Sequence, residues 1–120
     1  MLNISAEEEY SEEDYTVKSC AIALQKSYLV LVSDQEEYGL NNVIMGVPGV
    51  LEGSKAISSP APLFGFQNTF LGKSISELCA NMLKRPCLLL INVQGMQSRE
   101  NICAKIALKC VKRLLKKLEK

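Results

Sequence analysis

Histidine and tryptophan are both absent from the chain. Histidine is the commonest general base and metal ligand, so its absence removes most catalytic and metal-binding arrangements. The phosphate-binding patterns GxGxxG and GxxxxGK[ST] are also missing, and Gly46-Val47-Pro48-Gly49 has the pattern of a turn. Carboxylates concentrate in residues 7–14 and 34–37, where no rigid element is expected to hold an acid–base pair. We predict no enzymatic activity, no cofactor and no metal site.

Long apolar runs are missing as well. None approaches the roughly 18 residues that a membrane-spanning helix needs. Met1 is followed by polar and acidic residues, without a basic segment that leads into an apolar one, so no signal peptide is expected. The sequence therefore predicts a protein that is not associated with membranes.

The cysteines do not have the spacing of a redox or zinc site. Their number is odd, and no two of them form a C-x-x-C pair. Only Cys87, which follows Lys84 and Arg85, has cationic neighbours that favour a reactive thiolate. Buried, reduced thiols are the preferred interpretation, which predicts a cytoplasmic location with the nucleus as the alternative. The five are Cys20, Cys79, Cys87, Cys103 and Cys110.

The two ends of the chain carry opposite charge, although the net charge is only +1. Residues 6–15 are dominated by glutamate and aspartate, and no apolar face can be drawn through them. We interpret residues 1–15 as an acidic, mobile arm. The remainder, residues 16–120, has an ordinary globular composition and is expected to form one domain.

Hydrophobic periodicity predicts an α+β fold. Strands are expected at 16–24, 28–32, 43–47, 63–66 and 87–91, with residues 53–62 as a loop. Ser74 and Glu77 have the spacing of a capping box, which predicts a helix from Ser74 to the stop at Pro86. Ser98 caps a final helix that runs to Leu118. The fold class is a mostly antiparallel sheet of about five to six strands, with two helices packed on one face.

Two of the predicted strands, 28–32 and 87–91, are apolar at every position. Such strands need cover on both faces of the sheet, and two helices can cover only one. We therefore predict that the other face binds a second protein chain. The competing explanation is that loop 49–62 and the N-terminal segment fold over it. The predicted interface residues are Leu29, Leu31, Leu89 and Ile91.

The last helix is rich in lysine. Its basic side chains are interpreted first as the solvated face of an amphipathic helix, and then as a docking surface for an acidic protein patch. Binding to nucleic acid is a third interpretation, but no aromatic side chains interleave and arginine is scarce, so no nucleic-acid partner is predicted. The candidate docking residues are Lys105, Lys109, Lys112 and Lys116.

Residues 70–118 resemble the small chaperones that assemble the proteasome core particle. Leu71-Gly72 precedes the capped helix, Asn92-Val93-Gln94 closes the apolar strand, and a long helix follows. The hairpin 20–32 also fits the opening strands of that family. The resemblance implies α+β domains whose sheets pack face to face in a dimer, with a related chaperone or a second copy as partner. It also implies binding to proteasome α-subunits during α-ring assembly, without enzymatic activity.

A longin- or roadblock-like scaffold module of a trafficking or signalling complex is the alternative. Such modules also combine a sheet with flanking helices and form dimers. They usually place a long helix between early strands, whereas both helices are expected late in this chain. The order of the predicted elements therefore favours the chaperone interpretation.

Overall fold

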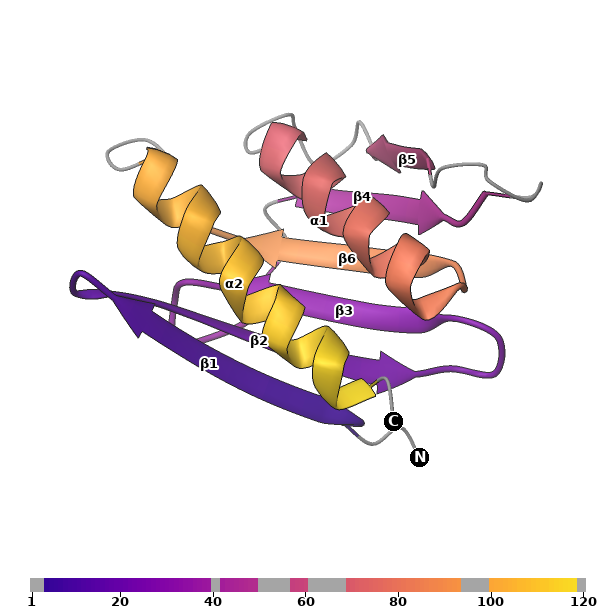
Figure 1. The fold of residues 1–120 in the computed structure, drawn as a ribbon, viewed down its shortest axis with the longest axis horizontal. Helices are drawn as coiled ribbons and strands as arrows, with labels where there is room; N and C mark the ends of the chain where they lie inside the picture. The colour runs from indigo at the N-terminus through magenta and orange to yellow at the C-terminus, as the bar shows by residue number, and fades with distance from the viewer. Residues whose placement is uncertain (1–3, 40–41, 50–56, 61–68, 94–99, 119–120) are drawn as a thin grey trace.

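The computed structural model describes residues 4–39, 42–49, 57–60, 69–93 and 100–118. They form two layers, a twisted sheet and a pair of helices that lie together on one of its faces (Figure 1). The elements are β1 (Ala6–Glu12), β2 (Tyr15–Ala23), β3 (Tyr28–Ser33), β4 (Asn42–Val47), β5 (Ile57–Pro60), α1 (Thr69–Leu83), β6 (Cys87–Asn92) and α2 (Glu100–Leu118).

The described strands form one sheet in the order β1-β2-β3-β6-β4-β5. The central pair, β3 and β6, is parallel, and every other neighbouring pair is antiparallel. This arrangement confirms the predicted α+β class, the mostly antiparallel sheet and the placement of both helices on one face. The parallel pair arises because α1 returns the chain across the sheet before β6 begins, as crossover connections do.

The core lies between the sheet and the helices. Val30 and Val32 of β3 and Leu89 and Ile91 of β6 are fully buried there, side by side in the register of the two strands. Helix α2 contributes a continuous apolar stripe with helical spacing. Its members are Ile106, Ala107, Cys110, Val111, Leu114 and Leu115.

Helix α1 begins earlier than its capping box predicts. It starts at Thr69, so Ser74 and Glu77 lie inside the helix instead of at its first turn. The preceding turn packs on the sheet: Leu71 is buried, and a Cβ on Gly72 would lie 3.3 Å from Cδ1 of Ile91. This packing extends the helix beyond the local signal.

The end of α1 is as predicted. The helix stops at Leu83, and Lys84 adopts a left-handed conformation with φ of 59°. The Lys84 N–H donates to the carbonyl oxygen of Ala80 at 2.9 Å, which closes the last turn before Pro86. For α2, the predicted cap Ser98 lies outside the described residues.

Residues Ala6–Glu12 do not belong to a solvated arm. They form β1, an edge strand antiparallel to β2, so the prediction of a mobile arm over residues 1–15 is wrong for this segment. Glu13 and Asp14 make a two-residue turn with φ of 53° and 62°. Positive φ at both central positions is the pattern of a type I′ hairpin, which asparagine and glycine usually form. The turn contains neither asparagine nor glycine, so the sequence alone gives no signal for a hairpin at this position.

A second short strand occupies part of the predicted loop 53–62. Ile57–Pro60 forms β5, which pairs antiparallel with β4 at the other edge of the sheet. Its Ser-Pro composition gives no strand pattern, and it is ordered by the edge of β4 that it joins. The predicted strand at 63–66 lies outside the described residues.

Candidate partner interface

The face of the sheet that lies away from the helices, here called the open face, carries a cluster of leucines. The β3–β6 register places Leu29 beside Leu88 and Leu31 beside Leu90. All four side chains are partly exposed, which distinguishes them from the fully buried residues between them in sequence. Met45 of β4 pairs with Leu88 and is 41% exposed, so the apolar surface extends across three strands.

Two of the four predicted interface residues lie on the wrong face. Leu89 and Ile91 are fully buried under the helices, whereas Leu29 and Leu31 do lie on the open face. The reason is the period of a strand: successive side chains alternate between faces, and every position of β6 up to Ile91 is apolar. The pattern alone therefore did not decide which set faces the helices. Leu88 and Leu90 take the places that were predicted for Leu89 and Ile91.

The segments that were expected to compete for the open face lie elsewhere, as far as they are described. β1 extends the sheet beyond β2, and β5 extends it beyond β4 (Figure 1). Both strands therefore widen the sheet and do not cover its open face. One corner of the face is covered. Lys18 lies over the ring of Tyr38, with Nζ 4.8 Å from its centroid, and donates to the carbonyl oxygen of Glu36. Burial raises the pKa of Tyr38 above its ordinary value.

The cations of α2 face β1 and form ion pairs with it. Glu12 lies 3.7 Å from Nζ of Lys105 and 3.3 Å from Nζ of Lys109. Glu8 lies 3.9 Å from Arg113 and 2.7 Å from Nζ of Lys117. These four contacts are here called the β1–α2 ion-pair row. Arg113 and Lys117 are not among the predicted site residues, because nothing local in the sequence pairs them with residues 6–12.

Tyr10 lies between the two glutamates of the row. Its hydroxyl donates to Oε2 of Glu12 at 2.7 Å, and its ring centroid lies 4.6 Å from the guanidinium carbon of Arg113 and 5.7 Å from Nζ of Lys109. The hydrogen bond from Tyr10, followed by that from Lys109, lowers the pKa of Glu12 below its ordinary value. The hydrogen bond to Glu12 in turn raises the pKa of Lys109.

The four predicted docking lysines fall into two classes. Lys105 and Lys109 belong to the ion-pair row and are already engaged by Glu12. Lys112 and Lys116 are exposed, and within the described part of the chain neither has an ion pair within 4.0 Å. An acidic surface of another protein could therefore contact Lys112 and Lys116 without displacing β1 from α2.

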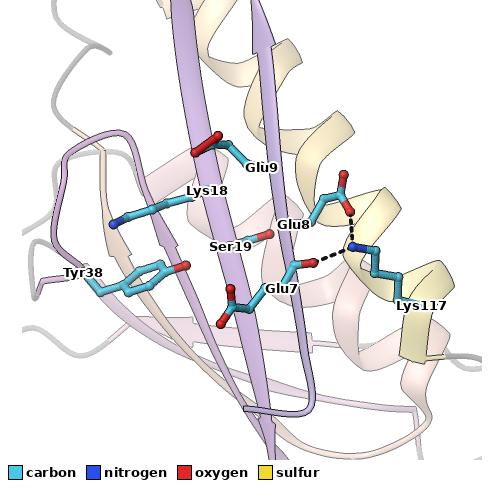
Figure 2. Close-up of a pocket in the computed structure, with 7 residues that line it drawn as sticks. All are labelled: Glu7, Glu8, Glu9, Lys18, Ser19, Tyr38 and Lys117. Atoms are coloured by element: carbon cyan, nitrogen blue, oxygen red, sulfur yellow. Dashed lines mark hydrogen bonds and ion pairs between the residues drawn. The ribbon is translucent and has the colours of Figure 1, made fainter.

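A hollow of about 320 Å³ lies beside the first half of β1. Figure 2 shows the side chains that line it. Three consecutive glutamates line it, together with two lysines, a serine and a tyrosine. Lys117 is engaged within it, because Nζ donates to the backbone carbonyl of Glu7 at 2.6 Å and pairs with the Glu8 carboxylate. The lining residues are Glu7, Glu8, Glu9, Lys18, Ser19, Tyr38 and Lys117.

The cysteines have the surroundings predicted for structural thiols. All five are free and buried. Burial raises the pKa of Cys87 to about 11, so the cationic neighbours of this residue do not create a thiolate. Among the described residues, no group of three histidine, cysteine, aspartate or glutamate side chains is placed to hold a metal ion. None of the described helices is long and apolar enough to cross a membrane.

Comparisons with known proteins support the fold alone. No model of a protein family matches the sequence, and no curated protein is similar to it at a significant level. A solved structure of a chaperone complex for yeast 20S proteasome assembly contains a chain with a similar fold, with a TM-score of 0.65. The match covers 95% of this chain and 98% of the yeast chain at 11% sequence identity. The likeness therefore extends over nearly the full length of both chains.

Proposed function

We propose that this chain is a proteasome assembly chaperone, closest in kind to proteasome assembly chaperone 4. In this proposal it pairs through its open face with a related, chaperone 3-like protein or with a second copy of itself. The pair then binds α-subunits of the 20S core particle while the α-ring assembles. Catalysis and a cofactor play no part in this role.

The observation that carries the proposal is the open face. Leu29, Leu31, Leu88 and Leu90 form a contiguous apolar surface at the centre of the sheet, and the exposed side chain of Met45 extends it. Burying a leucine side chain stabilises a complex by about 1.5–3 kcal/mol relative to leaving it in water. A partner that covers this cluster would gain that free energy, and face-to-face packing of sheets is what the family resemblance implies.

The contact to α-subunits is assigned to the opposite layer. The helices cover the other face of the sheet, and Lys112 and Lys116 project from α2 with no ion pair among the described residues. A dimer through the open face would leave this basic surface accessible to an acidic patch. Pairing and α-subunit binding would therefore use separate surfaces, which makes them separable by mutation.

The longin- or roadblock-like alternative gains no support from the order of the elements. Within the described residues, α1 and α2 both come after β5, and no helix lies between the strands that precede it. We therefore retain the chaperone proposal, and the experiment below also tests the alternative.

The test is affinity purification of the tagged chain from native lysate, with the captured proteins identified by mass spectrometry. Wild type should recover a related assembly chaperone together with proteasome α-subunits. Leu31→Asp should lose the chaperone, whereas Lys112→Glu with Lys116→Glu should lose α-subunits and keep the chaperone. Glu9→Gln on β1 is the matched surface control and should behave as wild type. Recovery of membrane-trafficking components without proteasome subunits would contradict the proposal.

A further inference from the structure

Strand β1 is held to α2 by charge as well as by apolar contact, because Glu8 and Glu12 form the ion-pair row while Ala6 and Tyr10 pack against the core. The side chains that it turns toward the helix are Ala6, Glu8, Tyr10 and Glu12, and all four are only partly buried. Ion pairs with exposed partners are individually weak and are screened by salt. The four cations of the row are 43–61% exposed, so part of the attachment of β1 consists of contacts that ionic strength can loosen.

The turn that joins β1 to β2 stores conformational strain. Glu13 and Asp14 both have positive φ, and Glu13 is the strained residue, because L-residues other than asparagine, aspartate and glycine rarely occupy this region. If the chain straightened through these two residues, they would return to the extended conformation and the strain would be released. Short hinge loops under strain are the sites at which an element is exchanged between two copies of a protein.

The register of the hairpin is compatible with such an exchange. The pairs run from Ala6 opposite Ala21 to Glu12 opposite Tyr15, so they are symmetric about the bond between Glu13 and Asp14. If two chains straighten at this bond and are related by a twofold axis through it, β1 of each copy lies against β2 of the other. Every β1–β2 residue pair of the single chain is then formed between the two copies. Each β1 would then also meet the α2 cations of the other copy.

We propose that β1 is an exchangeable strand, which leaves its own β2 and α2 and occupies the identical site on a second copy of this chain. The cations of α2 match the spacing of Glu8 and Glu12 on β1. A second copy of this chain offers the same cations, so we assign it as the partner that receives β1. The exchange uses the edge of the sheet and not the open face, so it goes beyond the proposed function and does not depend on it.

The ion-pair row adds to the barrier to exchange, beside the β1–β2 pairing that must also open. β1 must leave α2 before it can pair with another copy, and the row reforms afterwards, so the row contributes to the barrier more than to the equilibrium. The exchanged form also places Glu13 of one copy opposite Asp14 of the other, where like charges repel. Salt screens both effects, so exchange should become faster as the salt concentration rises.

The test mixes two single-substitution variants, Ser11→Cys and Thr16→Cys. These positions are opposite each other in the hairpin, both are exposed, and their hydroxyl oxygens lie 2.6 Å apart. After incubation and mild oxidation, a Ser11→Cys to Thr16→Cys disulfide, detected by peptide mass spectrometry, should exceed the two homodisulfides. Strand exchange places position 11 of one copy opposite position 16 of the other, so it favours only the mixed disulfide. Random collision forms the mixed disulfide and both homodisulfides. If the mixed disulfide shows no excess at any salt concentration, the proposal is overturned.

The role of the row is tested in the same assay with two matched pairs of substitutions on β1. Glu8→Gln with Glu12→Gln removes the acidic side of the row, and should accelerate formation of the mixed disulfide about tenfold. Glu7→Gln with Glu9→Gln makes the same change in charge on the opposite face and should leave the rate unchanged. Equal rates in the two pairs would overturn the assignment of the barrier to the row. Leu31→Asp should exchange like wild type, which separates this result from failure of the open-face dimer.

Discussion

Leu88 and Leu89 are consecutive residues of β6 that serve different surfaces: Leu89 is fully buried beneath the helices, and Leu88 is partly exposed on the open face. The alternation is a consequence of strand geometry. The two positions therefore separate the stability of the fold from the proposed association, although the residues are chemically identical.

Leu89→Asp should unfold the protein, whereas Leu88→Asp should leave it folded and weaken its association. A carboxylate at Leu89 would be buried without a partner, and we expect a loss of more than about 4 kcal/mol in the free energy of unfolding. Circular dichroism measures folding, and analytical ultracentrifugation measures association, alone and with the related chaperone. Normal assembly of Leu88→Asp in both settings would contradict the role of the open face.

Gly46→Ala should destabilise the fold by about 1–3 kcal/mol, because a Cβ at this position would lie 2.6 Å from the carbonyl oxygen of Ser76 in α1. Gly72→Ala is the matched control. The Cβ there would meet the end of the Ile44 side chain, and alanine favours the helix by about 1 kcal/mol over glycine. Urea unfolding of both variants measures the difference. Equal losses would contradict the distinction between the rigid backbone contact at Gly46 and the side-chain contact at Gly72.

Glu12→Gln should reduce stability at neutral pH and have no effect in strong acid. Because the folded pKa of Glu12 is lowered, its carboxylate stabilises the fold above the ordinary glutamate pKa, and this contribution disappears as pH falls through the folded pKa. Unfolding of wild type, Glu12→Gln and the exposed control Glu9→Gln at a series of pH values checks the sign. A difference between wild type and Glu12→Gln that persists unchanged into strong acid would contradict it.

Cys87 should be slow to react with thiol reagents in the folded protein. With its pKa raised to about 11, the thiolate fraction at pH 8 is smaller than that of a free cysteine by a factor on the order of 100. Mass spectrometry of timed iodoacetamide labelling, with the denatured protein as control, measures the ratio. Labelling of native Cys87 as fast as in the denatured chain would rule out the buried thiol.

The sequence predicted those elements whose apolar pattern is local. The apolar run of β6 and the apolar stripe of α2 located both segments, and Pro86 marked the end of α1. The start of α1 was missed because the packing of Gly72 on the sheet is a tertiary contact that the capping residues do not report.

The candidate site was only partly predictable for the same reason. β1 has the composition of a solvated segment, and the cations that pair with it, Lys105 to Lys117, follow roughly 90 to 110 residues later in the chain. The leucines of β6 identified an apolar strand with two apolar faces, but only the positions of the helices decided that Leu88 and Leu90 belong to the open face.

The place of β6 between β3 and β4 has a consequence for biosynthesis. During translation, β3 and β4 emerge well before the strand that joins them, so each presents unpaired backbone groups until residue 92 has left the ribosome. The parallel pairing of Tyr28 with Cys87 also requires a contact between distant parts of the chain, which slows folding. The chain would thus pass through a nascent state that itself needs protection from aggregation.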